Sequence, residues 1–301
     1  MSYYTAGPDS LVDGAEADPP LLLIHCVSAA ASAYEMKPLY EYFRTRRPVY
    51  AIDLPGFGFS ERDDVEYSPR IMTNAIHVLV AEIASRHGAV QIDAMALSLS
   101  SEFLARAAAE APKAFRSLGL ISPTGFETEH RHDDRPESSR ELKFVSWLLS
   151  FRPLGQALFI ALSRPRTIRY FLERTWGSRQ IDEGLWRYST FTAAQPGARY
   201  APLRFVTLAL FSADISCVYE ALQLPVWMSH GVRGDFTVYR GEKPIEKRRN
   251  WHISVFHTGA MPHFEMRQHF ISAYKLFLRQ HALRVRSVQL TQTEALRTAH
   301  R

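Results

Sequence analysis

The chain has 301 residues, 46% of them hydrophobic and 12% aromatic, which is enough for one large α/β domain or a domain with an insertion. A formal net charge of +5 is moderate for this length, and no nucleic-acid-binding motif is present, so we expect no nucleic-acid partner. The apolar runs are too short to cross a bilayer, the polar N-terminus does not resemble a signal peptide, and the two cysteines are far apart. We therefore expect a cytoplasmic protein with no transmembrane segment.

Strands and helices alternate along the first 125 residues. Short apolar runs predict buried strands at 19–25, 49–53, 90–95 and 118–121. Helical spacing predicts helices at 36–44 and 101–111, and a third helix begins at the capping Ser68 and the following Pro69. This alternation is typical of a mostly parallel sheet covered by helices on both faces.

The middle of the chain has a different pattern. Residues 126–215 contain helical segments rich in aromatic residues and arginine, and strands resume only at 225–229 and 252–256, before a last helix at about 264–279. We therefore divide the chain into a core of residues 1–125 and 216–301 and an inserted helical cap of residues 126–215. Such a cap would cover the ligand crevice at the carboxyl ends of the strands, although it could equally be a helical subdomain with its own core.

Ser98 stands at the turn between a predicted strand and the helix that follows it. Its neighbours at two residues on either side, Ala96 and Ser100, are small, as the sharp turn of a nucleophile elbow requires. The same five residues would also suit a serine that only caps the start of a helix. The sequence around Ser98 therefore has two interpretations, and other motifs have to separate them.

Two further turns follow predicted strands and carry a resemblance to a known family. They are His25-Cys26-Val27 and Asp53-Leu54-Pro55-Gly56-Phe57-Gly58-Phe59-Ser60. With the Ser98 turn, they make the chain from about Ser2 to Gln280 similar to the α/β-hydrolase superfamily, with an inserted cap. The resemblance implies an α/β-hydrolase fold, a mainly structural role for the second turn, and an oxyanion hole formed by the backbone N–H groups of Val27 and Leu99. Cys26 stands where the family usually has glycine.

Asp235 is the expected acid of a catalytic triad. It follows the predicted strand at 225–229 in a Gly-x-x-x-Asp pattern that resembles the acid loop of the superfamily. There it would accept the proton-bearing nitrogen of a catalytic histidine and fix the tautomer of that ring. The alternative interpretation is an ordinary turn aspartate next to Gly234.

The expected histidine position is occupied by alanine. Members of the superfamily often read Gly-His-x-Pro-His-x-Glu after the last strand, and alignment on Pro262-His263-Phe264-Glu265 puts Ala260 at the first histidine. Another histidine could serve as the base, either His263 or His257; the chain could have kept only a binding role; or the alanine was introduced on purpose. We favour His263, whose alternative role is to pack at the start of the last helix.

These residues predict a serine hydrolase of carboxylic esters with a hydrophobic moiety, acting through Ser98, Asp235 and His263 on a small ester substrate. Serine in place of aspartate at the elbow disfavours dehalogenation and epoxide hydrolysis. A catalytically impaired binding protein and a C–C bond hydrolase are the alternatives. We expect no metal and no cofactor: residues 130–134, which include two histidines, are expected to form a solvated loop, and the glycines of the 53–60 turn lack the spacing of a dinucleotide site.

Overall fold

A computed structural model of the chain describes residues 1–8, 18–126, 135–235, 238–239 and 243–281. Its centre is a seven-stranded sheet in the order β1-β3-β2-β4-β5-β6-β7, in which only the β1–β3 pair is antiparallel. The strands are β1 (Ser2–Ala6), β2 (Leu21–Ile24), β3 (Val49–Asp53), β4 (Ile92–Leu97), β5 (Phe115–Ile121), β6 (Val226–Gly231) and β7 (Trp251–Phe256). The predicted α/β-hydrolase architecture is thereby confirmed.

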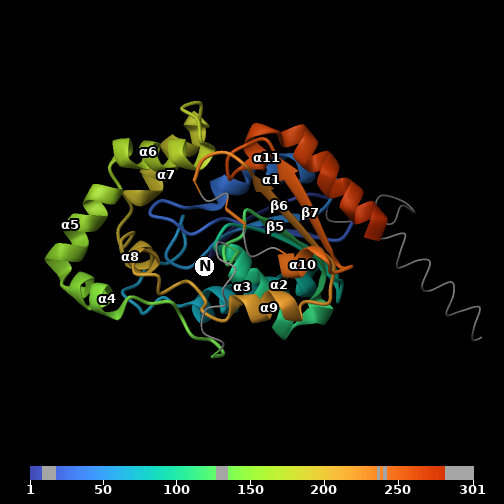
Figure 1. Cartoon of the computed structure of the whole chain (residues 1–301), viewed down its shortest axis with the longest axis horizontal. Coiled ribbons are helices and arrows are strands. Elements are labelled where there is room, and N and C mark those ends of the chain that lie inside the picture. Colours follow the sequence, from blue (N-terminus) through green and yellow to red (C-terminus); the bar gives the residue numbers. More distant parts are fainter. Residues whose placement is uncertain (9–17, 127–134, 236–237, 240–242, 282–301) are drawn as a thin grey trace, which may run out of the picture.

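The sheet is buried because helices cover both of its faces. Figure 1 shows α1 and α11 on one side of the sheet and α2, α3 and α9 on the other. All residues of β2, β3 and β4 are buried, which explains why these strands read as continuous apolar runs and not as an alternating pattern. The helices and 3-10 turns of the core are η1 (Ala33–Met36), α1 (Lys37–Phe43), α2 (Pro69–His87), α3 (Ser100–Glu110), η2 (Pro112–Ala114), α10 (Lys243–Glu246) and α11 (Pro262–Glu265), and residues 267–281 are also helical.

The helical insertion lies between β5 and β6, as predicted. It consists of α4 (Lys143–Ser150), α5 (Arg152–Leu162), α6 (Pro165–Trp176), α7 (Glu183–Ala193), α8 (Tyr200–Val206) and α9 (Ile215–Ala221). Its α4 and α5 helices form the end of the molecule farthest from the sheet (Figure 1). The stretch at residues 130–134, which we expected to be a solvated loop, lies outside the described residues.

Buried polar contacts fasten the insertion to α3, the helix that follows Ser98. The Arg106 guanidinium pairs with Asp214 at 2.5 Å, and the Glu102 carboxylate accepts the backbone N–H of Ser212 at 2.7 Å. All four residues are buried. The end of the insertion is therefore tied to the same helix that positions the candidate nucleophile.

The Asp53 turn has the structural role expected of it. The Asp53 carboxylate accepts the N–H groups of Ala33, at 2.8 Å, and of Phe59, at 2.9 Å. Gly58 lies against this carboxylate with a φ of 53°, and a β-carbon there would be only 2.0 Å from an Asp53 oxygen. The turn therefore requires glycine at position 58 both for its backbone conformation and for space.

No single helix of the described residues is long and apolar enough to cross a bilayer. Helices α4 and α5 satisfy that length and composition only when they are taken together, and a bend of 100° separates them.

Candidate active site

Ser98 has the backbone conformation of a nucleophile elbow. It follows the last residue of β4, its φ is 55°, and α3 begins two residues later. A left-handed φ is uncommon for a residue other than glycine and is found where the surrounding structure imposes it. The turn is held on both sides, because the Ser98 N–H bonds the Ile121 carbonyl at 2.7 Å and the Ser98 carbonyl accepts the N–H of Ser101 at 3.0 Å.

The neighbours of Ser98 are packed as the elbow requires. Ala96 and Ser100 are completely buried, so larger side chains at these positions would collide with the surrounding core. Ser98 itself is only partly buried. In the described part of the chain, no side chain or backbone group forms a hydrogen bond with its hydroxyl group, so Oγ is available to a substrate.

A second serine with a left-handed backbone stands at the end of the neighbouring strand. Ser122 follows β5 with a φ of 45°, but it is buried and its hydroxyl donates to the Ala260 carbonyl at 2.7 Å. Its bonding leaves Ser98 as the more accessible of the two. The same contact also places the backbone at position 260 at the end of β5, the strand that pairs with β4.

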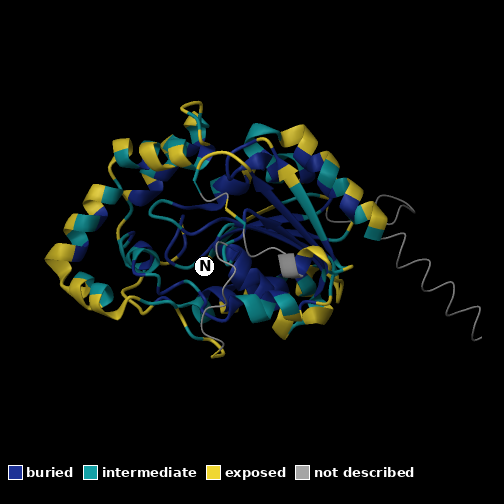
Figure 2. Ribbon diagram, in the orientation of Figure 1, coloured by how far each residue is buried: buried dark blue, intermediate teal, exposed yellow. Residues whose placement is uncertain are grey.

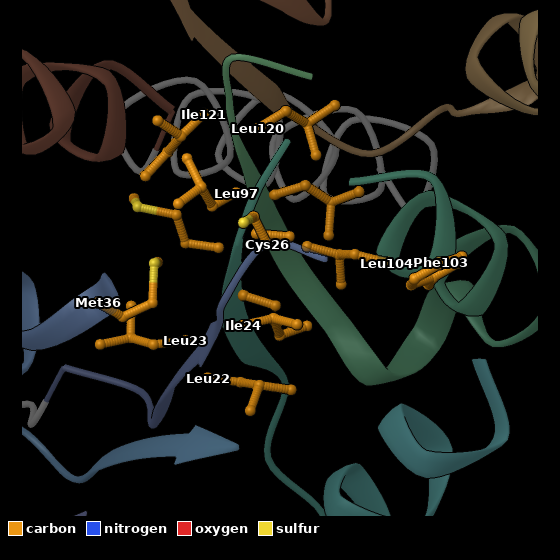
Figure 3. Close-up of a cluster of buried hydrophobic side chains, with 14 of the residues drawn as sticks. Leu22, Leu23, Ile24, Cys26, Met36, Leu97, Phe103, Leu104, Leu120 and Ile121 are labelled. Atoms are coloured by element: carbon orange, nitrogen blue, oxygen red, sulfur yellow. The ribbon is translucent and has the colours of Figure 1, made fainter. Parts of the chain in front are cut away.

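The turn after β2 is held by buried polar groups. The Leu54 N–H donates to Nε2 of His25 at 2.9 Å, so the other ring nitrogen carries the proton and donates to the Cys26 carbonyl. The Cys26 N–H and thiol both donate to the Glu35 carboxyl group, at 2.8 and 3.2 Å. Cys26 thus replaces the expected glycine by adding a bond to Glu35, and Figure 3 shows it within the apolar cluster that includes Leu97.

Burial changes the acidity of the groups at this turn. It raises the pKa of Glu35 to about 7, because the carboxylate is removed from water. Burial, together with the adjacent Glu35, also raises the pKa of the Cys26 thiol well above its usual range. Cys26 is therefore a neutral hydrogen-bond donor at this turn, and a thiolate nucleophile is disfavoured there.

The two backbone groups expected to form the oxyanion hole are free of other bonds. The N–H groups of Val27 and Leu99 donate no hydrogen bond to another described residue, although both residues are buried. Leu99 stands at the start of α3, where backbone N–H groups have no partner within the helix and favour negative charge. Their assignment as oxyanion donors is compatible with this bonding and stays a prediction.

Asp235 is bound to the insertion. Both of its carboxylate oxygens accept from the Arg174 guanidinium, at 2.7 and 2.8 Å, and its N–H donates to the Arg174 carbonyl at 3.0 Å. The two side chains line a surface pocket of about 350 Å³ between α6 and the loop after β6. Both carboxylate oxygens are thus bonded to the arginine, and no described histidine forms a hydrogen bond with Asp235.

The turn after β7 is ordered by backbone bonds around Ala260. The Ala260 N–H donates to the Thr175 carbonyl at 2.9 Å, and the preceding Gly259 N–H donates to the Glu265 carboxylate at 2.7 Å. Ala260 is 5% exposed. The turn therefore has a defined position next to Ser122, but its residue 260 has no side chain that could take a proton.

His263 is buried at the start of α11. Its Nε2 bonds the carbonyl oxygen of Glu35 at 2.7 Å, and because a carbonyl only accepts, Nε2 carries the proton. Nδ1 then holds the lone pair and has no partner among the described residues. Burial lowers the pKa of His263 to about 4, so the ring is neutral at pH 7.

The described residues do not join Ser98, Asp235 and His263 by hydrogen bonds. Asp235 is bonded to Arg174, His263 to Glu35, and the alternative base His257 is exposed after β7. The roles of all three in a triad stay predictions. Sequence reasoning missed Glu35 and Arg174. Glu35 stands just before the predicted helix at 36–44, and Arg174 is one of several arginines in the cap, so the local pattern singles out neither residue.

Comparison with known proteins agrees with this geometry. The profile of the Alpha/beta hydrolase family matches residues 21–273. The chain belongs to the alpha/beta hydrolase family. No curated protein matches it in sequence.

Solved structures share the hydrolase fold at low identity. A serine hydrolase involved in carbazole degradation has a TM-score of 0.70 and 16% identity, over 92% of this chain and 94% of that one. A bacterial membrane phospholipase A has a TM-score of 0.68 and 19% identity, over 93% of this chain and 82% of that one. The 2-hydroxy-6-oxo-6-phenylhexa-2,4-dienoate hydrolase of a Rhodococcus strain has a TM-score of 0.67 and 16% identity, over 92% of this chain and 94% of that one. The phospholipase and the dienoate hydrolase are named for different substrate classes, so the likeness carries the fold and not the substrate.

Proposed function

We propose that this hydrolase cleaves carboxylic esters with a hydrophobic moiety, with Ser98 as nucleophile. The observation that carries the proposal is the left-handed backbone of Ser98 at the strand-to-helix turn, with a hydroxyl group that no described residue occupies. Ser98 Oγ attacks the ester carbonyl and transfers its proton to a base, and the N–H groups of Val27 and Leu99 hold the oxyanion. Loss of the alcohol leaves an acyl-serine, which water then hydrolyses.

We propose His263 as that base because its Nδ1 bears an unpartnered lone pair. The Nε2–H bond to the Glu35 carbonyl fixes this tautomer, as the triad acid does in other serine hydrolases. For Asp235 to act as the orienting acid, its carboxylate would have to leave Arg174 and take the place of the Glu35 carbonyl as acceptor of the Nε2–H. A low histidine pKa reduces the driving force for proton transfer, so we expect slow turnover.

A binding protein on a hydrolase scaffold is the second candidate. The observation that favours it is Ala260, which stands in an ordered turn but cannot move a proton. A C–C bond hydrolase would use the same Ser98 chemistry, and the Rhodococcus neighbour is named for such a substrate.

The decisive experiment is labelling by a fluorophosphonate probe together with turnover assays. Parent, Ser98→Ala and His263→Gln proteins are compared on p-nitrophenyl butyrate, p-nitrophenyl octanoate and 2-hydroxy-6-oxo-6-phenylhexa-2,4-dienoate. Ser122→Ala is the matched control, since it removes the other serine with a left-handed backbone. We expect labelling of the parent and of Ser122→Ala only, loss of ester turnover in Ser98→Ala by about a thousandfold or more, and faster cleavage of the octanoate.

Each outcome separates the candidates. An unlabelled parent protein without turnover would favour the binding protein. Cleavage of the dienoate without ester cleavage would assign the C–C bond reaction. Turnover that survives in His263→Gln would remove His263 as base and leave Ser98 as nucleophile.

A further inference from the structure

The outer surface of the insertion carries an exposed group of large apolar side chains. We propose that this surface docks the protein on an anionic phospholipid bilayer. We call it the α4–α5 face, and it consists of Phe144, Trp147, Leu148, Phe151, Leu154 and Ile160. The proposal does not depend on the ester hydrolase activity, because it concerns a surface at the far end of the molecule from the sheet (Figure 1).

The α4–α5 face is apolar where a solvated helix would be polar. Its side chains are between 38% and 72% exposed, and no residue of α4 is buried. Trp147 contacts two other aromatic side chains: its ring centroid lies 5.9 Å from that of Phe144 and 5.2 Å from that of Phe151. The three rings therefore form one continuous patch. Figure 2 shows both helices mainly in the colour of exposed residues. An exposed apolar patch on a protein surface marks a site of contact with another protein or with a membrane.

Close packing fixes the corner between α4 and α5. Gly155 at the start of α5 is buried, and a β-carbon at this position would lie 2.5 Å from the Leu149 carbonyl oxygen. The helices can therefore pack closely across their 100° bend. The N-terminal end of α4 is also fixed, because the Leu142 N–H donates to the Thr207 carbonyl at 2.9 Å.

The chain segment that forms the face carries charge of one sign only. Residues 142–172 contain five basic residues and no acidic residue: Lys143, Arg152, Arg164, Arg166 and Arg169. Lys143, Arg164 and Arg166 are exposed and have no acidic partner among the described residues. Arg152 faces Asp64 at 3.6 Å, and Arg169 pairs with Glu183. Unpaired basic groups beside exposed aromatic side chains are the pattern of a helix that lies in the interface of an anionic membrane.

This chemistry selects a lipid surface over a second copy of the chain. A symmetric dimer through the α4–α5 face would bring the same patch of both copies together and set like charges against each other. Anionic headgroups would neutralise those charges while the acyl region receives the apolar side chains. Helices of 8 and 11 residues are too short to span a bilayer, which takes about 20 residues, so docking would be peripheral.

Vesicle co-sedimentation of the full chain tests the proposal. We compare phosphatidylcholine vesicles with vesicles of equal phosphatidylcholine and phosphatidylglycerol, using Ser98→Ala so that lipid is not consumed. We expect binding to the anionic vesicles, weakened about thirtyfold in Arg164→Ala/Arg166→Ala, since each basic residue contributes a factor of about five. Trp147→Ala should weaken it by about tenfold or more.

Matched variants elsewhere on the surface serve as controls. Arg267→Ala/Arg279→Ala removes the same charge from the exposed side of the last helix, and Val78→Ala removes an apolar side chain of α2 that is 60% exposed. Both should bind like the parent. Equal losses in the control pair, or no sedimentation with anionic vesicles, would overturn the proposal. A dimer in solution that Trp147→Ala dissociates would assign the face to a second copy and overturn it as well.

Fluorescence identifies the side chain that enters the lipid. The chain has five tryptophans, and Trp147 alone among them is exposed. Lipids with brominated acyl chains should quench the parent protein, and Trp147→Phe should bind but lose that quenching. Quenching that persists in Trp147→Phe would show that another surface enters the membrane and would contradict the proposal.

Discussion

The turn after β4 and the turn after β7 lie at the same edge of the sheet, but their chemistry differs. At the first, a strained backbone exposes the hydroxyl of Ser98. At the second, Ala260 is held equally well by Thr175 and Ser122, yet its side chain is a methyl group. The turn after β7 thus keeps a defined backbone although residue 260 has no side chain that could transfer a proton, because the Thr175 carbonyl and the side chains of Ser122 and Glu265 hold it.

A third turn, the one after β2, is joined to the turn after β7 through Glu35. Glu35 holds Cys26 after β2 through its carboxyl group and His263 after β7 through its backbone carbonyl. The candidate oxyanion turn and the candidate base are thus joined through one residue. The predictions below change residue 260, the buried side chains of Glu35 and His263, and the bonding of Asp235. Each tests a different part of the difference between the Ser98 turn and the Ala260 turn.

The largest effect is expected from Ala260→His. A histidine there would start from a backbone that is bonded to Ser122, next to the strand of Ser98, and could act as the base in place of His263. General base catalysis contributes about 10²- to 10⁴-fold, so we expect kcat for p-nitrophenyl esters to rise by that order. Steady-state kinetics measure it.

A double variant is the control for Ala260→His. Ser98→Ala/Ala260→His should show none of the gain, because the new base would have no nucleophile to activate. The larger side chain at a buried site is expected to cost about 1–3 kcal/mol of stability, which thermal unfolding checks. A properly folded Ala260→His protein as slow as the parent would show that position 260 does not reach Ser98.

The next effect concerns the pH dependence of stability that the buried side chains of Glu35 and His263 produce. The folded-state pKa of Glu35, about 7, lies above the ordinary 4.5, so the unfolded chain loses this proton first and stability falls as pH rises from 4.5 to 7. His263 has a folded-state pKa of about 4 against the ordinary 6.5, so stability rises from pH 4 to 6.5. The two contributions oppose each other and are each worth about 3 kcal/mol.

Single variants should reveal the two opposing contributions. Relative to the parent, Glu35→Gln should gain about 3 kcal/mol of unfolding free energy between pH 4.5 and 7, and His263→Gln should lose a similar amount between pH 4 and 6.5. Urea unfolding at several pH values measures both differences. Glu61→Gln, at a residue whose side chain is 81% exposed, is the control and should run parallel to the parent. Parallel curves for all variants would show that neither buried group titrates as described.

Much of the fold could be predicted because its signals are local. The buried strands are short apolar runs, and the elbow is visible as Ser98 between small residues at a strand end. The 53–60 turn is marked by glycines that its geometry needs. Strand β1 was not predicted, since Ser2–Ala6 is polar and partly exposed and gains its strand structure only by antiparallel pairing with β3.

The partners in the site could not be predicted because they come from distant parts of the chain. Asp235 and Arg174 are 61 residues apart, and His263 meets the carbonyl of a residue 228 positions earlier. A motif identifies a side chain that could act, but its partners depend on how the insertion packs over the core. Arg174 lies in the insertion, 61 residues before Asp235, so the pattern after β6 does not single it out as the partner.

The smallest effect is expected from release of Asp235, and it should depend on position 260. Arg174→Gln removes the guanidinium that occupies both carboxylate oxygens. In the parent background, the Nε2–H of His263 is bonded to the Glu35 carbonyl, so a released Asp235 has no imidazole N–H to orient and kcat should stay unchanged. In the Ala260→His background the freed carboxylate could orient the new imidazole, and we expect a further rise of about tenfold, well below the ~10⁴-fold that an orienting aspartate can contribute. Steady-state kinetics of the parent, the two single variants and the double variant measure the coupling between positions 174 and 260. Equal effects of Arg174→Gln in both backgrounds would show that Asp235 does not orient a histidine at position 260.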